Sequence, residues 1–228
     1  MEWLGLDMHA HLLPGIDDGA ADIEQSVAFV RELGQLGFSK LICTPHIFTE
    51  LYPNTSETIG TALRQVKTAL NNEQVNVTVE AAAEYMVDDT FQVCKGLLCM
   101  PGRHVLIEMS YISETPNIEQ VVFELQLIGF KVILAHPERY LFYHKNADRY
   151  RRLKDMGLLF QVNLLSLGGY YGREVKQAAE HLMNKKSYDF AGTDLHHGRH
   201  MAALKNFVLS GNLYNAAGNY PFKNKSLL

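Results

Sequence analysis

Asp7-Met8-His9-Ala10-His11-Leu12-Leu13-Pro14-Gly15-Ile16-Asp17-Asp18-Gly19 is the stretch around which the predicted fold is organised. Two histidines separated by one residue on a strand point to the same side, because side chains alternate with a period of two. Both imidazoles can therefore reach one point, and the acidic pair in the Gly-flanked turn adds oxygen ligands beside them. The stretch predicts the start of a metal site, although His-x-His also occurs in proteins where it binds no metal.

The composition is that of an ordinary globular protein. Of the 228 residues, 47% are apolar and 20% are charged, which excludes a largely disordered chain. This length suits one large domain, so we expect a single domain over residues 1–228, with a packed or mobile tail from Gly211. The formal net charge of −4 and the lack of a strongly basic block exclude the electrostatic footprint of a nucleic-acid binder.

We expect a cytoplasmic protein. No apolar run reaches the roughly 18 residues of a membrane span, and the first residues lack the basic and apolar regions of a signal peptide. The three cysteines, Cys43, Cys94 and Cys99, form no Cys-x-x-Cys pair, so neither a disulfide framework nor a thiolate metal site is expected. None is followed six positions later by arginine, which excludes the Cys-x₅-Arg loop of thiol-dependent tyrosine phosphatases.

Short apolar strands alternate with amphipathic helices along the chain. After the opening strand, we expect strands over 40–44, 76–82, 104–108, 131–135, 158–163 and 188–193, and helices over 22–36, 59–70, 118–128, 148–156, 173–185 and 201–209. Nearly continuous apolar strands separated by such helices predict parallel β/α units with both faces of the sheet covered. No GxGxxG or GxxxxGKS/T loop supports the nucleotide-binding forms of an open sheet.

Histidines and carboxylates stand at the ends of almost every expected strand. They are His9, His11, Asp18, His46, Glu84, Glu108, His136, Asp194 and His196. These side chains would converge on one face of a closed barrel but would spread along the edge of an open sheet, which favours the barrel. Any one of them could be a core histidine or a capping carboxylate. All of them together would repel one another unless cations neutralised them.

So many nitrogen and oxygen ligands exceed what one metal ion needs, and a carboxylate such as Glu84 can bridge two ions. We therefore infer a centre of two or three divalent ions. Imidazole and carboxylate without thiolate suit Mn²⁺, Fe or Zn²⁺ and do not choose among them. Such a centre lowers the pKa of a bound water toward about 7 and stabilises the attacking and leaving oxygens of an in-line displacement, which is the chemistry of phosphoester hydrolysis.

The candidate ligands stand in short motifs that follow one another along the chain. These are His-x-His, Asp18, Thr44-Pro45-His46, Glu84, Ile107-Glu108, Ala135-His136-Pro137-Glu138-Arg139 and Gly192-Thr193-Asp194-Leu195-His196. Together they resemble the PHP superfamily of metal-dependent phosphoesterases. LPGIDDGA at 13–20 and AHPER at 135–139 are similar to its CpsB/CapC/YwqE-type branch, the manganese-dependent protein-tyrosine phosphatases of bacterial capsule and exopolysaccharide systems. The resemblance covers residues 4 to 208 and implies a distorted TIM-like barrel of seven β/α units.

The resemblance also implies how the ligands are divided among the ions. A first ion would be held by His9, His11, Glu84 and Asp194, a second by Glu84, Glu108 and His136, and a third by Asp18, His46 and His196. Manganese is the metal that the branch implies, with iron or zinc as alternatives.

Two arginines are candidates for binding the phosphate. Arg139 follows a ligand histidine, and a guanidinium contacts phosphate oxygens at two points; the alternative is a surface salt bridge with Glu138. The family places a second arginine some five residues after the last ligand histidine, whereas here His197-Gly198-Arg199-His200 follows. Arg199, alone or with His200, is the candidate for this role, unless both face solvent at the start of a helix.

The resemblance implies hydrolysis of phosphotyrosine on a protein. The expected partner is an autophosphorylated, membrane-associated tyrosine kinase of the capsule or exopolysaccharide machinery. A tyrosinate leaving group, with an intrinsic pKa of about 10, needs little general-acid help. Four tyrosines either line the mouth of the site or are ordinary rim aromatics, namely Tyr140, Tyr143, Tyr170 and Tyr171. The alternatives are a histidinol-phosphate phosphatase, which shares the superfamily's ligands, and a non-catalytic regulatory module that binds a kinase through a fold with structural metals.

Overall fold

Parallel strands with helices outside them make up the structure. The computed structural model describes residues 1–228. One sheet has three strands, in the order β1 (Leu6–Ala10), β2 (Lys40–Cys43) and β4 (Thr78–Ala81). The other has six, in the order β3 (His46–Ile47), β5 (Glu84–Met86), β6 (His104–Glu108), β7 (Lys131–Ala135), β8 (Leu159–Asn163) and β9 (Phe190–Gly192).

The two sheets together form a distorted barrel with seven strand positions. Strand β3 continues β2 after a break at Pro45, which has no N–H for a ladder hydrogen bond. Strand β5 likewise continues β4, and Glu84 N donates to Pro45 O at 3.1 Å across the break. The barrel closes between β9 and β1, where Asp194 N donates to His9 O at 2.7 Å and His11 N donates to Leu195 O at 2.9 Å. The predicted seven-unit barrel is confirmed, but two of its expected strands are each broken in two.

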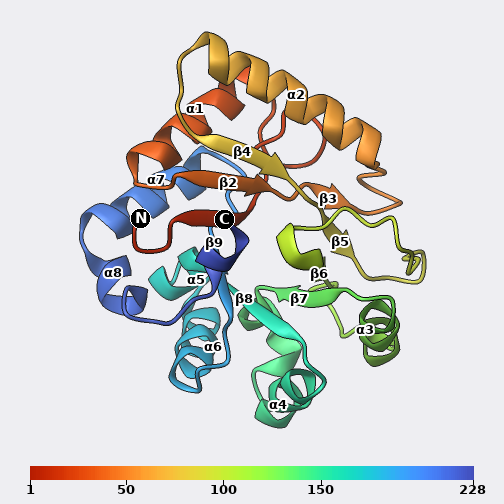
Figure 1. The fold of residues 1–228 in the computed structure, drawn as a ribbon. Helices are drawn as coiled ribbons and strands as arrows, with labels where there is room; N and C mark the ends of the chain where they lie inside the picture. Colours follow the sequence, from red (N-terminus) through yellow and green to blue (C-terminus); the bar gives the residue numbers. More distant parts are fainter.

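Helices cover the outside of the barrel (Figure 1). The longer ones are α1 (Ile23–Gln35), α2 (Ser56–Asn72), α3 (Ile118–Leu127), α4 (Ala147–Asp155), α6 (Arg173–Asn184) and α7 (Gly198–Leu209), close to the ranges expected from the sequence. Asp22 caps α1 by accepting a hydrogen bond from Gln25 N at 2.8 Å. The sequence did not predict the short helices α5 (Leu164–Gly168) and α8 (Asn212–Ala217), nor the 3₁₀ turns η1 (Pro101–Arg103), η2 (Pro137–Arg139), η3 (Leu141–Tyr143) and η4 (Asn224–Leu227).

A bulge in β1 turns the two histidines of His-x-His into the barrel. Leu6 and Met8 belong to a buried cluster formed mainly by strand residues, which fills the barrel interior. Regular alternation would therefore turn His9 outward. However, Asp7 pairs with Leu41 and Ala10 pairs with Cys43. Between these two pairings β1 advances by three residues and β2 by only two, so β1 contains one extra residue. The extra residue reverses the alternation and brings the histidines to the interior.

The last eighteen residues pack in two places, with α8 against α5 and α7, and η4 against β1 at the end of the barrel opposite the histidines. Leu227 is fully buried in the interior cluster. The Asn224 side chain accepts from Ala191 N at 3.0 Å and donates to Leu6 O at 3.1 Å, so it ties β9 to β1 where the barrel closes. Of the packed and mobile tails that the sequence allowed, the structure has the packed one.

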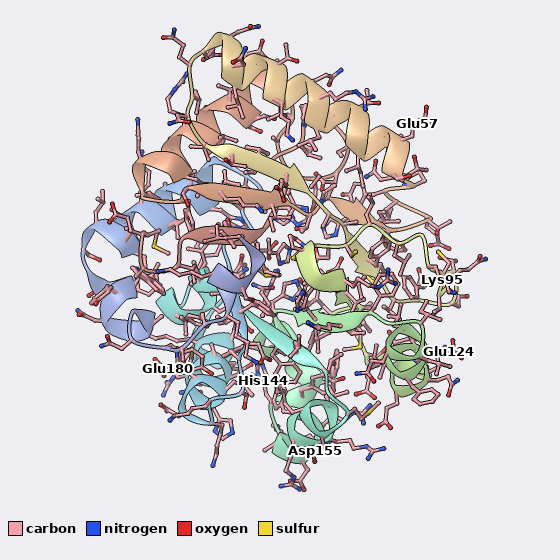
Figure 2. The ribbon with its side chains drawn as sticks, viewed as in Figure 1. Glu57, Lys95, Glu124, His144, Asp155 and Glu180 are labelled. Carbon is pink, nitrogen blue, oxygen red and sulfur yellow. The ribbon has the colours of Figure 1, made fainter.

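The main apolar core lies between the barrel and its helices, and many charged side chains lie on the outer surface. Figure 2 shows Glu57, Glu124, Asp155 and Glu180 on the outer sides of their helices and Lys95 on a peripheral loop. None of the helices has the length and apolar character needed to cross a membrane.

Candidate metal centre

The barrel opens into a pocket of about 360 Å³ at the carboxyl ends of its strands. Its lining consists of Asp18, His46, Phe48, Leu51, Tyr52, Glu84, Met86, Glu108, Tyr111, His136, Arg139, Tyr171, Asp194, His196, His197 and His200. Every predicted metal ligand is in this lining except His9 and His11, which are fully buried beneath it. The strand ends therefore converge as the barrel argument requires.

Glu84 lies at the centre of the cluster. Its carboxylate is fully buried. Its Oε2 lies 3.2 Å from His9 Nε2, 3.3 Å from His11 Nε2 and 3.2 Å from His46 Nδ1, and its Oε1 lies 3.3 Å from His136 Nε2. Neither oxygen makes a hydrogen bond. Buried carboxylate oxygens without a hydrogen bond, surrounded by aimed ring nitrogens, fit a site built for cations.

Three overlapping groups of side chains have ligand atoms within 4.8 Å of one another. They are His9, His11, Glu84 and Asp194; His11, Asp18, His46 and His196; and His46, Glu84 and Glu108. The first group has the composition that the family resemblance implied. The second adds His11 to the implied set, and the third has His46 where His136 was implied. His136 Nε2 lies 3.9 Å from Glu108 Oε2, farther than its contact with Glu84.

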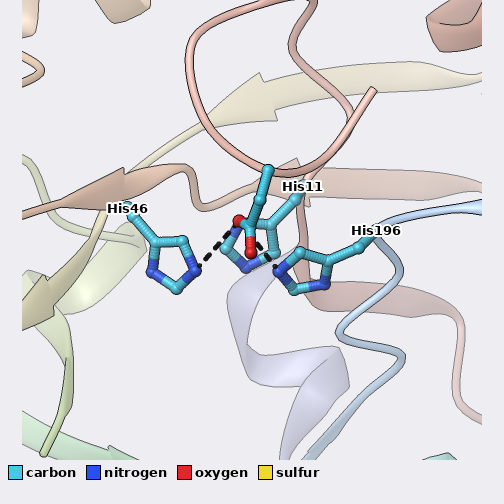
Figure 3. Close-up of side chains that lie close together, drawn as sticks. His11, His46 and His196 are labelled. Carbon is cyan, nitrogen blue, oxygen red and sulfur yellow. Dashed lines mark ion pairs between the residues drawn. The ribbon is translucent and has the colours of Figure 1, made fainter. Parts of the chain in front are cut away.

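Asp18 faces the outermost part of the centre. Its Oδ1 lies 3.4 Å from His46 Nε2 and 3.4 Å from His196 Nε2, and both pairs are drawn with His11 in Figure 3. About half of the Asp18 side chain is exposed. Because this group is the most accessible of the three, solvent reaches it more easily than it reaches Glu84.

Hydrogen bonds fix the orientation of three of the histidines predicted as ligands. His9 Nδ1 lies 2.9 Å from Gln161 Oε1, and His11 Nδ1 lies 2.8 Å from Asp17 Oδ2. His196 Nδ1 lies 2.9 Å from the Asp194 carbonyl oxygen. An acceptor at Nδ1 holds the proton there and leaves Nε2 free as a ligand, which is the usual arrangement around protein-bound metals. Gln161 was not among the predicted site residues, since a glutamine in an apolar strand gives no signal of this role, and Asp17 was predicted only as part of the turn.

The backbone around the ligands is unusually constrained. His136 and Asp194 have positive φ angles of 34° and 50°, which cost free energy for residues other than glycine and are found mainly at functional sites. At Gly192 a Cβ atom would lie 2.6 Å from His9 Cβ. Glycine is therefore needed in the Gly192-Thr193-Asp194 motif so that β9 can approach the first histidine of β1.

The charge balance of this cluster is suited to cations. Burial would raise the pKa of Glu84, but the surrounding histidines, His9 first, hold it well below its usual range. Burial and His11 would lower the pKa of His46, but its ion pairs with Asp18 and Glu108 raise it to about 10. Without metal, protons on the histidines compensate the buried carboxylates. Divalent cations can replace those protons.

Arg139 lies at the edge of the pocket and contacts Asp194. Its Nη1 donates to Asp194 Oδ2 at 2.8 Å, whereas Asp194 Oδ1 faces the histidines. The alternative partner considered from the sequence, Glu138, is buried elsewhere and accepts hydrogen bonds from Asn163 N and Tyr188 Oη. The Arg139–Glu138 salt bridge is therefore not formed.

Of the other residues predicted to contact the phosphate or the tyrosine ring of a substrate, some line the pocket and some do not. Arg199 is exposed on the first turn of α7 and does not line the pocket, whereas His200 does. Tyr140 and Tyr143 are core residues, since they are buried behind the pocket. Tyr171 lines the pocket, and Tyr170 packs beside it without lining it. Pocket tyrosines that the sequence did not single out are Tyr52 and Tyr111.

A family model described as "Capsular polysaccharide synthesis, CpsB/CapC" matches residues 5–205. The chain belongs to this family. Tyrosine-protein phosphatase YwqE of Bacillus subtilis is 28% identical over 195 residues, which cover 84% of this chain and 77% of that protein. Tyrosine-protein phosphatase CpsB of Streptococcus pneumoniae is 26% identical over 198 residues, covering 84% and 79%.

Solved structures agree with this membership. Crystal structures described as YwqE from Bacillus subtilis and CpsB from Streptococcus pneumoniae, unique metal-dependent tyrosine phosphatases, match 98% of this CpsB/CapC-family chain and 94% of the solved chain, at 25% identity and a TM-score of 0.82. An amidohydrolase from Mycoplasma synoviae matches with a TM-score of 0.57 and 11% identity. At that identity the likeness extends to the fold alone, a TIM-like barrel.

Proposed function

We propose that this chain is a metal-dependent protein-tyrosine phosphatase of the CpsB/CapC family. The observation that carries the proposal is the Glu84 cluster, in which a fully buried carboxylate without hydrogen bonds lies against four ring nitrogens at the base of an open pocket. Its relatives named as tyrosine-protein phosphatases make phosphotyrosine the first substrate to test.

The centre would hold two or three ions, most simply manganese. The nine side chains predicted from the sequence would be the ligands. Eight of them make up the three groups described above, in which His11, His46 and Glu84 each belong to two, and His136 would join them through its contact with Glu84. Divalent cations bound there supply an acidified water and neutralise charge on the phosphoryl oxygens. Donors of nitrogen and oxygen only, with no thiolate in the pocket lining, are compatible with Mn²⁺, Fe and Zn²⁺.

Arg139 would bind the phosphoryl group. It lies beside Asp194 with most of its side chain buried. One guanidinium N–H group donates to Asp194, and other N–H groups of the planar guanidinium can donate to a second acceptor. Attraction to the phosphoryl oxygens would orient phosphorus toward the cluster, which is the positioning that in-line attack requires. Electrostatic stabilisation of the transition state by Arg139 would add to this effect.

The pocket also suits an aryl leaving group. Tyr52, Tyr111 and Tyr171 line it together with Phe48 and Leu51, and aromatic side chains pack well against a tyrosine ring. A departing tyrosinate, with an intrinsic pKa of about 10, needs little protonation by an acid. A protein substrate also fits the openness of the pocket, since a phosphotyrosine can enter it from an extended chain.

The substrate we propose is an autophosphorylated tyrosine kinase of the capsule or exopolysaccharide machinery, dephosphorylated in the cytoplasm. The family description places the CpsB/CapC proteins in capsular polysaccharide synthesis. A kinase with phosphotyrosines in an extended segment would present them to the pocket without unfolding. Loss of phosphotyrosine from purified, autophosphorylated candidate kinases, each mixed separately with the metal-loaded protein, would test this part of the proposal.

The experiment that tests the proposed function compares two substrates. With Mn²⁺ at matched concentration and pH, kcat/KM is measured for a phosphotyrosine peptide and for histidinol phosphate. We expect the peptide to be hydrolysed with the higher kcat/KM. The reverse order would transfer the chain to histidinol-phosphate hydrolysis, and no turnover of either substrate by metal-loaded protein would favour the non-catalytic regulatory module.

A further inference from the structure

The guanidinium of Arg139 is held by two aromatic rings as well as by Asp194. Its Cζ atom lies 4.7 Å from the ring centroid of Tyr111 and 4.2 Å from that of Tyr171. A guanidinium over an aromatic face is attracted by the ring quadrupole, and more strongly where water is excluded. Two rings and one carboxylate therefore restrict a side chain that would otherwise have several rotatable bonds.

Tyr171 connects this arrangement to a ligand. Its hydroxyl group accepts a hydrogen bond from Asn163 Nδ2 at 3.1 Å, and the same amide donates to Asp194 Oδ2 at 2.9 Å. Asp194 Oδ2 also accepts from Arg139 at 2.8 Å. Asn163 and Arg139 thus both donate to one oxygen of Asp194, Tyr171 is linked to it through Asn163, and Asp194 Oδ1 is left for the metal cluster.

Tyr111 comes from a different part of the chain, the loop between β6 and α3. The loop is fixed at its far end, because Thr115 Oγ1 donates to Val87 O at 2.6 Å and Glu114 accepts two hydrogen bonds at 2.7 Å from Arg149. Tyr111 itself is 44% exposed. A ring on a fixed loop can hold Arg139 without being part of the core.

We propose that Tyr111 and Tyr171 are positioning residues that hold Arg139 ready for the phosphoryl group. Asp194 takes one of the five guanidinium N–H donors, and the rings keep the remaining donors at the pocket. The inference rests on the proposed function, since it concerns how the same pocket binds a phosphate ester. The competing explanation is that the two rings only stack against the ring of the substrate.

Two substitutions at Tyr111 separate the ring from its hydroxyl group. Tyr111→Phe keeps the aromatic face, whereas Tyr111→Leu removes it from a partly exposed position. We expect Tyr111→Leu to lower kcat/KM for a phosphotyrosine peptide about tenfold and Tyr111→Phe to stay within about twofold of wild type. Equal losses in both variants would assign the effect to the hydroxyl group and overturn the proposal.

A second readout uses inorganic phosphate, which has no ring to stack. If Tyr111 acts through Arg139, the inhibition constant of phosphate rises about as much as kcat/KM falls in Tyr111→Leu. In an Arg139→Ala background the same substitution should change kcat/KM by less than about twofold, because the residue it positions is gone. An unchanged phosphate inhibition constant, or the same tenfold loss in both backgrounds, would assign Tyr111 to substrate stacking.

The same kcat/KM and phosphate-inhibition measurements on Tyr171→Leu test the role of the second ring. The melting temperature of each variant establishes that it is folded. The comparison of Tyr111→Leu in the wild-type and Arg139→Ala backgrounds does not depend on the substrate being phosphotyrosine. If the protein proved to prefer histidinol phosphate, the proposed function would fail, while the Tyr111–Arg139 coupling could still be measured with that substrate and with inorganic phosphate.

Discussion

At Glu84, one buried carboxylate lies against four imidazole nitrogens from three strand ends, those of β1, β2/β3 and β7. We expect Glu84→Gln to lower bound metal and to reduce turnover by at least about a hundredfold, because the amide keeps the shape but removes the charge that balances the cations. Elemental analysis of the purified variant and steady-state kinetics check this. Glu57→Gln, an exposed change on α2, is the matched control and should behave like wild type.

Arg139 supports a second prediction at this scale. Arg139→Ala should lower kcat/KM for phosphomonoesters by the equivalent of about 2–4 kcal/mol, and Arg139→Lys should restore only part of it, because an ammonium group cannot make a planar two-point contact. Kinetics with a phosphotyrosine peptide and with p-nitrophenyl phosphate provide the comparison. A value for Arg139→Ala within twofold of wild type would reduce Arg139 to a structural partner of Asp194.

At the scale of secondary-structure elements, the close approach of β9 to β1 can be tested at one glycine. Gly192→Ala would bring a Cβ atom to 2.6 Å from His9 Cβ, so we expect displacement of His9, loss of bound metal and a lower melting temperature. Gly198→Ala, at the start of α7, meets no atom within 4 Å and is the control. Wild-type metal content in Gly192→Ala would show that β9 does not fix the position of His9.

Helix capping gives a prediction that separates stability from activity. Asp22 accepts a hydrogen bond from Gln25 N and caps α1, so Asp22→Ala should lower the free energy of unfolding by about 1 kcal/mol. Asp22→Asn should lose much less, since its amide oxygen can still accept. Urea denaturation measures both variants, and kcat should change in neither, because Asp22 is exposed and outside the pocket.

The elements could be predicted from the sequence where apolar periodicity dominates, and less well where the site distorts them. Strands β6 and β7 begin and end where the pattern placed them, since each is an uninterrupted apolar run. The bulge that reverses β1 leaves no trace in residue types, and short β5 after Ala83 looks like the end of one longer strand. Both irregularities lie next to predicted ligands, where a break in the regular strand geometry changes the direction of a side chain.

The candidate site was predictable in its ligand types but less so in its surroundings. Histidines and carboxylates at strand ends form a pattern in the sequence. Gln161 contacts His9 and Tyr111 contacts Arg139 only because the fold brings them together, so no sequence pattern marks them. Tyr140 illustrates the converse error: it follows the AHPER motif directly, but a 3₁₀ turn carries it into the core, where its hydroxyl group accepts a hydrogen bond from Met109 N. A tyrosine's neighbours in space cannot be read from its neighbours in sequence.

For the molecule as a whole, the buried charges predict how metal affinity depends on pH. The pKa of His46 is raised to about 10 by its carboxylate partners, and that of His11 is also raised. The metal-free protein therefore holds protons at neutral pH that cations must displace, so affinity for Mn²⁺ should rise as pH increases from about 6 to 8. Calorimetric titration in buffers of different protonation enthalpy measures the released protons. Binding without proton release would mean that the histidines are already neutral.

The most direct test of the account is a metal back-titration of the whole protein. Chelator-treated protein is titrated with Mn²⁺ while hydrolysis of a phosphotyrosine peptide and bound metal are measured together, with and without prior iodoacetamide treatment. The account predicts no turnover without metal, return of turnover as two to three ions bind per chain, and no effect of alkylation, since no cysteine lines the pocket. Full activity in the metal-free protein, or its loss on alkylation alone, would contradict the metal-dependent mechanism.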